Sequence, residues 1–94
     1  MVTMFVRHMV GDYGKWKKVY DELGPVRSKM GVTGASVHRD ASDPTTIIVT
    51  HQFKDLKSAQ VFGESDELKS AMKKAGVSGP PEIWFGEDVE HTKF

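Results

Sequence analysis

The sequence predicts a small α+β domain in which one antiparallel sheet of four strands carries helices on one face. The chain has 94 residues, which is the length of a single domain. Its apolar patterns follow one another in the order strand, helix, strand, strand, helix, strand. The strand segments also carry apolar side chains on both faces, so the sheet needs a cover on each side.

Four segments have the composition and the alternation of β-strands. The predicted strands are residues 2–10, 32–39, 45–53 and 82–86. The third is the strongest by composition, because it contains the β-branched run Thr-Thr-Ile-Ile-Val-Thr. Turn-forming residues at 40–44 predict a hairpin between the second and third strands, and the segment 78–81 predicts a rigid loop before the last strand.

Two longer segments have the three- and four-residue spacing of an amphipathic helix. The first follows Asp12, which is suited to cap a helix, and a kink is expected at the pair 24–25, glycine and proline. The second follows another capping residue, Asp55. Gly63 weakens this helix, and Ser65 with the two acidic residues after it predicts a fresh helix start.

This order of elements predicts a ferredoxin-like βαββαβ sandwich with both helices on one face of the sheet. Right-handed crossovers are expected to make residues 2–10 and 45–53 parallel neighbours at the sheet centre. The other face carries Phe5, Met9 and Ile48 and is left bare. A stable interface buries about 800 Å² on each partner, so a two-fold, sheet-on-sheet homodimer is the simplest cover.

Composition excludes several classes of function. Thirteen basic and thirteen acidic residues cancel, and no basic run is present, so the charge pattern of a nucleic-acid binder is missing. The absence of cysteine excludes disulfides and thiolate metal sites. The apolar runs are too short to span a membrane, and no signal-peptide layout is recognisable. We therefore expect a cytoplasmic protein of one domain, residues 1–94, with a polar C-terminal tail over 86–94.

Several short motifs give the chain a resemblance to a known superfamily. They are Phe5-Val6-Arg7-His8 running into Asp12-Tyr13-x-x-Trp16, Pro25-x-Arg27 before Gly31-Val32, Val49-Thr50-His51-x-Phe53, and Pro81-Glu82-Ile83-Trp84-Phe85. With these motifs, the whole chain resembles the dimeric α+β barrel superfamily, which includes antibiotic biosynthesis monooxygenases and small cyclase-like proteins. The resemblance implies a homodimer and a pocket within each subunit, between helices and sheet. It leaves the reaction open, because members of this fold catalyse unrelated reactions.

Two histidines are the candidate catalytic residues. His8 lies near the end of the first strand and His51 near the end of the third, each on the side expected to face the helices. In parallel neighbouring strands both imidazoles would lie at one end of one pocket, with His8 as general base and His51 as acid or orienting donor, or the reverse. The alternative is that each is a half-buried structural histidine. No metal site is expected, since catalytic zinc needs about three protein ligands and His38 and His91 are expected elsewhere.

Aromatic residues supply the candidate substrate-binding walls. Tyr13, Trp16 and Tyr20 form a stripe along the first helix, and Phe62 and Trp84 could add further walls. A flat aromatic or apolar ligand would pack well against such a surface. The alternative is that the stripe simply belongs to the hydrophobic core.

These features predict a cofactor-free cyclase or isomerase that acts on a small aromatic or polyketide-like carbonyl compound through histidine acid–base chemistry. One alternative is a non-catalytic dimeric module that binds a ligand or serves in a stress response, and another is a cofactor-independent monooxygenase. The resemblance implies tryptophan and asparagine around the substrate in oxygen-using members, and this chain has no asparagine, which counts against the last alternative. Arg27 is expected to be an exposed surface charge, with anion binding at the pocket mouth as the alternative.

Overall fold

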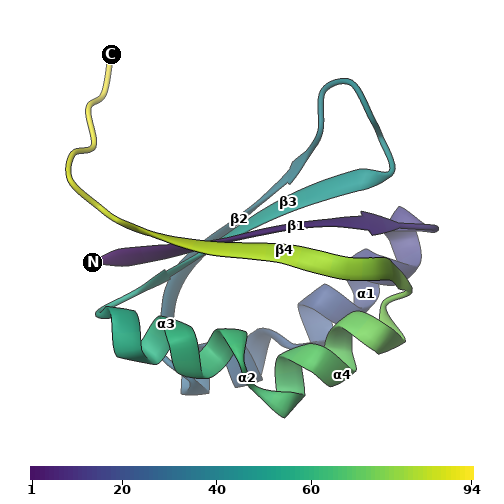
Figure 1. Cartoon of the computed structure of the whole chain (residues 1–94), viewed down its shortest axis with the longest axis horizontal. Coiled ribbons are helices and arrows are strands. Elements are labelled where there is room, and N and C mark those ends of the chain that lie inside the picture. The colour runs from purple at the N-terminus through teal and green to yellow at the C-terminus, as the bar shows by residue number, and fades with distance from the viewer.

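The computed structural model describes all residues from 1 to 94 and has one sheet with helices on a single face (Figure 1). The elements in chain order are β1 (Val2–Val10), α1 (Tyr13–Glu22), α2 (Gly24–Lys29), β2 (Val32–Arg39), β3 (Thr46–Phe53), α3 (Leu56–Gly63), α4 (Asp66–Lys74) and β4 (Val77–Glu87). Figure 1 shows the four helices gathered on one side of the sheet, with the other side free of helices. The predicted α+β, ferredoxin-like fold is confirmed.

The strands lie in the order β2-β3-β1-β4, and every neighbouring pair is antiparallel. The predicted parallel pairing of the first and third strands is therefore wrong. A crossover through helices makes β1 and β2 run the same way and leaves room for one strand between them. The hairpin then folds β3 back into that space, so β3 runs antiparallel to both neighbours.

Side-chain caps begin the helices where the sequence predicts them. Asp12 Oδ1 accepts a hydrogen bond from the Lys15 amide at 3.2 Å, and Asp55 Oδ1 accepts one from the Ser58 amide at 2.8 Å. Ser65 Oγ accepts one from the Leu68 amide at 3.1 Å, which confirms the fresh start of α4. At the Gly24–Pro25 pair the expected kink separates two helices: α1 ends at Glu22, Leu23 is the turn residue between them, and α2 begins with proline in its first turn.

The last strand is longer than the sequence predicts. It begins at Val77, so the segment 78–81 belongs to β4 and is not a separate loop. The register with β1 shifts between Arg7 and Met9, which accommodates Pro80 and Pro81 on an edge strand where no donor is needed. Beyond β4 the residues 88–94 have no regular structure, although the Asp88 amide donates to the Met1 carbonyl at 2.9 Å. None of the helices has the length and hydropathy that a membrane-spanning helix needs.

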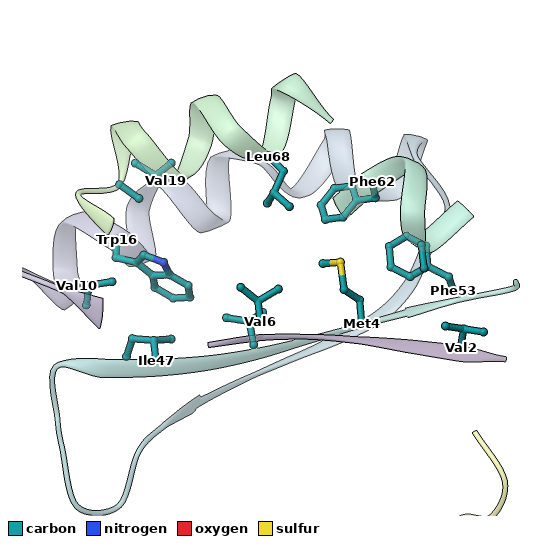
Figure 2. Packing of buried hydrophobic residues seen from close by; sticks show 13 residues of the cluster. Val2, Met4, Val6, Val10, Trp16, Val19, Ile47, Phe53, Phe62 and Leu68 are labelled. Atoms are coloured by element: carbon teal, nitrogen blue, oxygen red, sulfur yellow. The ribbon is translucent and has the colours of Figure 1, made fainter. Parts of the chain in front are cut away.

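Alternate side chains of β1 and β3 point at the helices and form the core (Figure 2). The buried apolar residues are Val2, Met4, Val6, Val10, Trp16, Val19, Ile47, Val49, Phe53, Ala59, Phe62, Leu68 and Ala75. Figure 2 shows Phe53 and Phe62 beside Met4 at one end of this core and Trp16 above Ile47 at the other. His8 and His51 belong to the same alternating sets, so folding of the core also places both imidazoles beneath the helices.

The helix-free face of the sheet is part apolar and part polar. Phe5 of β1 stacks on Trp84 of β4, with ring centroids 5.4 Å apart and planes at 8°. Trp84 stays 44% exposed and Met9 stays 51% exposed. His38 lies on this face as well, where its Nε2 is 2.9 Å from Ser36 Oγ. We call Phe5, Met9, Ile48 and Trp84 the bare-face patch.

Substituting Phe62 tests the packing of the core between α3 and the sheet. Phe62→Ala removes a fully buried ring that contacts Phe53 and His51, so we expect a loss of about 3–5 kcal/mol in the free energy of unfolding. Val61→Ala on the same helix is the control, because Val61 is 54% exposed and should cost less than about 0.5 kcal/mol. Urea unfolding measures both values, and equal losses for the two variants would contradict this description of the core.

Candidate functional site

A narrow cavity lies between the sheet and helices α1 and α4. Its lining comprises Val6, His8, Trp16, Val19, Tyr20, Leu23, Val49, His51, Leu68, Ala71, Met72 and Ala75. The two histidines are the polar exceptions in an otherwise apolar wall. The cavity volume is about 40 Å³, which is room for a few water molecules. A small apolar cavity with a few polar groups turned towards it has the general make-up of a ligand site.

The two histidines stand at opposite ends of this cavity. His8 pairs across the sheet with Ile47, while His51 pairs with Met4. Four residues of strand therefore separate them, which is roughly 13 Å along the sheet. The expectation that they share one end of the pocket is wrong, because it depended on parallel strands. Both still line the same cavity, so they can hold two ends of one ligand but cannot act together on one atom.

Burial keeps both imidazoles uncharged at neutral pH. His8 is 6% exposed and His51 is 4% exposed. Desolvation lowers the pKa of His8 to about 4, and desolvation with a smaller effect of the Arg27 charge lowers the pKa of His51 to about 4. Each neutral ring has one nitrogen that donates and one that accepts a hydrogen bond.

Most of these ring nitrogens have no protein partner. Both nitrogens of His8 and Nδ1 of His51 are buried without a hydrogen bond to any other residue. A buried polar atom without a partner costs roughly 1–3 kcal/mol. A side chain placed at this cost in an apolar wall needs an explanation, and binding a polar group of a ligand is one that fits the lining.

A row of stacked aromatic rings forms the α1 wall. Tyr13 and Trp16 have centroids 5.9 Å apart, and Trp16 and Tyr20 have centroids 5.0 Å apart. The row joins the two histidines, because His8 lies 5.7 Å from Trp16 and His51 lies 6.5 Å from Tyr20, again between ring centroids. This surface suits a flat ring system.

The predicted substrate-binding residues lie in four different places. Trp16 and Tyr20 line the cavity, whereas Tyr13 extends the row beyond it. Phe62 contacts His51, with centroids 5.2 Å apart, but is itself core. The prediction that Trp84 forms a wall of the pocket is wrong, because this side chain stacks on Phe5 on the helix-free face. Parity could not decide this, since both faces of β4 carry apolar residues.

Sequence reasoning missed the residues of α4 that close the cavity. Leu68 and Met72 are one helical turn apart and face the sheet, and their spacing was the available signal. Arg27 was also placed wrongly as an exposed charge: it is half-buried against Tyr20. No group of three or more histidine, aspartate or glutamate side chains is arranged to hold a metal ion.

The sequence matches no protein-family model and no curated protein closely enough to show a relationship. Solved structures do match. A protein of Bordetella bronchiseptica, provisionally described as an antibiotic biosynthesis monooxygenase, has a TM-score of 0.81 at 16% identity over 95% of this chain and 97% of its own. The chain has the fold of the antibiotic biosynthesis monooxygenases.

Two further structures of this fold extend the comparison. A provisionally described antibiotic biosynthesis monooxygenase of Nitrosomonas europaea has a TM-score of 0.73 at 15% identity over 96% of this chain and all of its own. SnoaB of Streptomyces nogalater, a cofactor-independent oxygenase, has a TM-score of 0.77 at 12% identity over 96% of this chain and 94% of its own. The resemblance predicted from the motifs is confirmed for the fold, and identities this low do not extend to residue roles.

The depressed pKa values make a prediction about stability against pH. In the unfolded chain these histidines take up protons near pH 6.5, whereas in the folded protein they stay neutral down to about pH 4. The unfolded state therefore binds more protons than the folded state in this window. The contribution of the two histidines to the free energy of unfolding falls as the pH drops from about 6.5 to about 4, and it is constant above about pH 6.5. Urea unfolding at several pH values measures the fall.

Aspartate and glutamate side chains also change the stability as the pH falls, and His8→Leu separates the effect of the histidine from theirs. The variant keeps the volume of the side chain and lacks the imidazole, so we expect it to lose a large part of the fall in stability between pH 6.5 and pH 4. NMR titration of the ring carbons gives the pKa values directly in the wild-type protein. A midpoint of either His8 or His51 near pH 6.5 would contradict the burial described here.

Proposed function

We propose that the protein is a cofactor-independent monooxygenase that oxidises a flat, acidic aromatic ketone or phenol in the cavity between helices and sheet. One observation carries the proposal: two uncharged histidines with unpartnered ring nitrogens face an apolar cavity walled by stacked aromatic rings. The comparisons add support, since SnoaB of the same fold is described as a cofactor-independent oxygenase. They favour this alternative over the cyclase or isomerase that the sequence suggested.

The proposed reaction begins with proton transfer to an imidazole. We assign the base to His51 rather than His8, because the positive charge of Arg27 lies near His51 and stabilises the anion that forms. A base with a pKa of about 4 is available at pH 7 but weak. The substrate must therefore be acidic, with its negative charge spread over a conjugated ring system. His8 at the other end donates or accepts a hydrogen bond that orients the molecule.

The electron-rich anion then reacts with dioxygen itself. The carbanion carbon forms a bond to one oxygen atom, and His51 returns its proton to the other, which gives a hydroperoxide. Loss of water from this hydroperoxide leaves a carbonyl group. In balance, a CH₂ group and one dioxygen molecule give a C=O group and one water molecule, with the substrate as the only reductant. The residues contribute the base, the orientation and the exclusion of solvent.

Substrate binding needs the cavity to widen on the α4 side. A ligand pocket is usually about 300–1,000 Å³, well above the 40 Å³ of this cavity. A surface hollow of about 360 Å³ between α4 and β4 shares Leu68 and Met72 with the cavity lining. Rotation of these two side chains would join the two spaces, and Met72 is flexible enough to take a new rotamer.

Oxygen uptake with anthrone, a tricyclic ketone with an acidic CH₂ group, tests the proposed activity. We expect wild-type protein to consume one dioxygen per anthrone and to produce anthraquinone. His51→Ala should lower the rate by about 10²–10⁴-fold, because it removes the general base. His91→Ala is the matched control, since His91 lies in the irregular C-terminal segment. A full rate in His51→Ala, or no uptake above the uncatalysed rate in wild type, would refute the proposal.

We also propose that a second copy of the chain covers the helix-free face. The bare-face patch supports this, because an exposed tryptophan and an exposed methionine beside a stacked aromatic pair form an apolar surface of the kind that marks an interface. Two copies related by a two-fold axis would bury the patch against itself. The ligand cavity lies on the opposite side of the sheet, so assembly and binding use separate faces.

Light scattering on two lysine variants tests this assembly. Met9→Lys places a charge in the bare-face patch and should shift the particle from twice the chain mass to the chain mass. Val61→Lys introduces the same charge on the exposed side of α3 and should leave the mass unchanged. Wild-type protein that is already a monomer at micromolar concentration would rule out the dimer.

A further inference from the structure

Arg27 is a half-buried cation without an acidic partner. It lies in α2, and its guanidinium carbon is 3.6 Å from the centroid of the Tyr20 ring. Its Nη1 atom is buried and has no hydrogen-bond partner. The molecule has three ion pairs, and none of them includes Arg27. Withdrawing part of a charged group from water is costly unless an opposite charge or hydrogen bonds compensate it.

Arg27 reaches Tyr20 across the junction of two helices. The two residues are seven apart, a spacing that keeps them on one side of the chain from α1 to α2, and the guanidinium lies over the Tyr20 ring. Trp16 stacks on the same tyrosine with centroids 5.0 Å apart, and Lys17 Nζ lies farther off, 5.8 Å from its centroid. The short contact of Arg27 with Tyr20 holds this cation beside the cavity wall.

The positive charge of Arg27 acts on the end of the cavity at which His51 lies. It contributes to the lowered pKa of His51 after the larger effect of desolvation. The side chains of Tyr20 and His51 both line the cavity. Arg27 is not itself a lining residue, but its contact with the Tyr20 ring places the cation next to that end of the lining. None of the cavity-lining residues is acidic, so no side chain of the lining supplies the missing negative charge. An anion on a ligand would supply it with charge-assisted hydrogen bonds.

We propose that Arg27 is the anion-binding residue of the cavity and that the ligand is a flat aromatic molecule whose oxyanion, a carboxylate or a phenolate, lies at the His51 end. The inference rests on the proposed function in one respect: the oxyanion is taken to be the ionised substrate. It also gives that substrate a direction. The charged oxygen lies towards Arg27, the ring system lies along Trp16 and Tyr20, and any second polar group reaches His8.

Binding of two naphthalene probes with the same shape tests the proposal. Naphthoate carries a carboxylate, and naphthamide is its uncharged counterpart. Fluorescence quenching reports binding, because Trp16 lines the cavity and the other tryptophan can be removed as Trp84→Phe in every protein compared. We expect wild-type protein to bind naphthoate more tightly than naphthamide. A third probe, naphthol, should bind with the absorption spectrum of its phenolate.

The variants have a matched control in Arg39. Arg39 also stacks on a ring of the aromatic row, with its guanidinium carbon 4.7 Å from the Tyr13 centroid, but it is exposed, and Tyr13 does not line the cavity as Tyr20 does. Arg27→Gln should weaken naphthoate binding about tenfold or more and leave naphthamide binding unchanged, since a charged hydrogen bond is lost. Arg27→Lys should retain part of the preference, and Arg39→Gln should change neither affinity.

Three results would overturn the proposal: equal affinity of wild type for the two naphthalene probes, equal weakening of both by Arg27→Gln, or no binding of either. The oxygenase is judged separately. Selective weakening of naphthoate without anthrone turnover would keep the anion site and reject the oxygenase. Anthrone turnover with an unchanged naphthoate affinity in Arg27→Gln would keep the oxygenase and reject the anion site. Circular dichroism confirms folding, and Arg27→Lys provides the readout if the glutamine variant does not fold.

Discussion

The pairing register of β1 with β3 is the constraint on which the rest of this molecule depends. It sends one set of alternating side chains, Met4, Val6 and His8 on β1, towards the helices, together with Val49 and His51 on β3. A slip of one residue would exchange these side chains for those of the other face, including Arg7. The core is thus packed only in the register that also buries the two histidines. The packing that stabilises the folded state therefore also fixes the positions of His8 and His51.

This arrangement has an energetic cost that the aliphatic and aromatic core must offset. Three ring nitrogens of the two histidines lie in the apolar layer without protein partners. A domain of ordinary stability has only about 5–15 kcal/mol in total, so groups that cost roughly 1–3 kcal/mol each are a large burden for a chain of this length. Residues of this kind are found where binding or chemistry requires them. The other face of the sheet, with its exposed Met9 and Trp84, is free to serve assembly.

Much of the fold could be predicted because its signals are local. The caps at Asp12, Asp55 and Ser65 and the alternation along β1 are each decided by a few neighbouring residues. The histidines could be assigned to the helix side by parity alone. The direction of β3 relative to β1 depends on how the hairpin returns to the sheet, which is a property of the whole chain. That single error placed the two imidazoles at one end of the pocket.

The rest of the site depended on contacts between distant residues. The partner of Trp84 could not be found from β4, whose two faces are both apolar, and the stack on Phe5 follows only from the register. Arg27 has the sequence surroundings of a surface charge, and its contact with the Tyr20 ring depends on a side-chain conformation that no local pattern predicts. Leu68 and Met72 are recognisable as a helix stripe, but their place in the wall of a cavity requires α4 to be seen against the sheet.

A crystal structure of the protein with naphthoate tests the central claim that the helix side of the sheet, and not its bare face, holds the ligand. The naphthalene ring should lie against Trp16 and Tyr20, with Leu68 and Met72 in new rotamers and the carboxylate beside the guanidinium of Arg27. A ligand seated on the bare-face patch against Phe5 and Trp84, with the helix-side cavity still closed, would contradict the account.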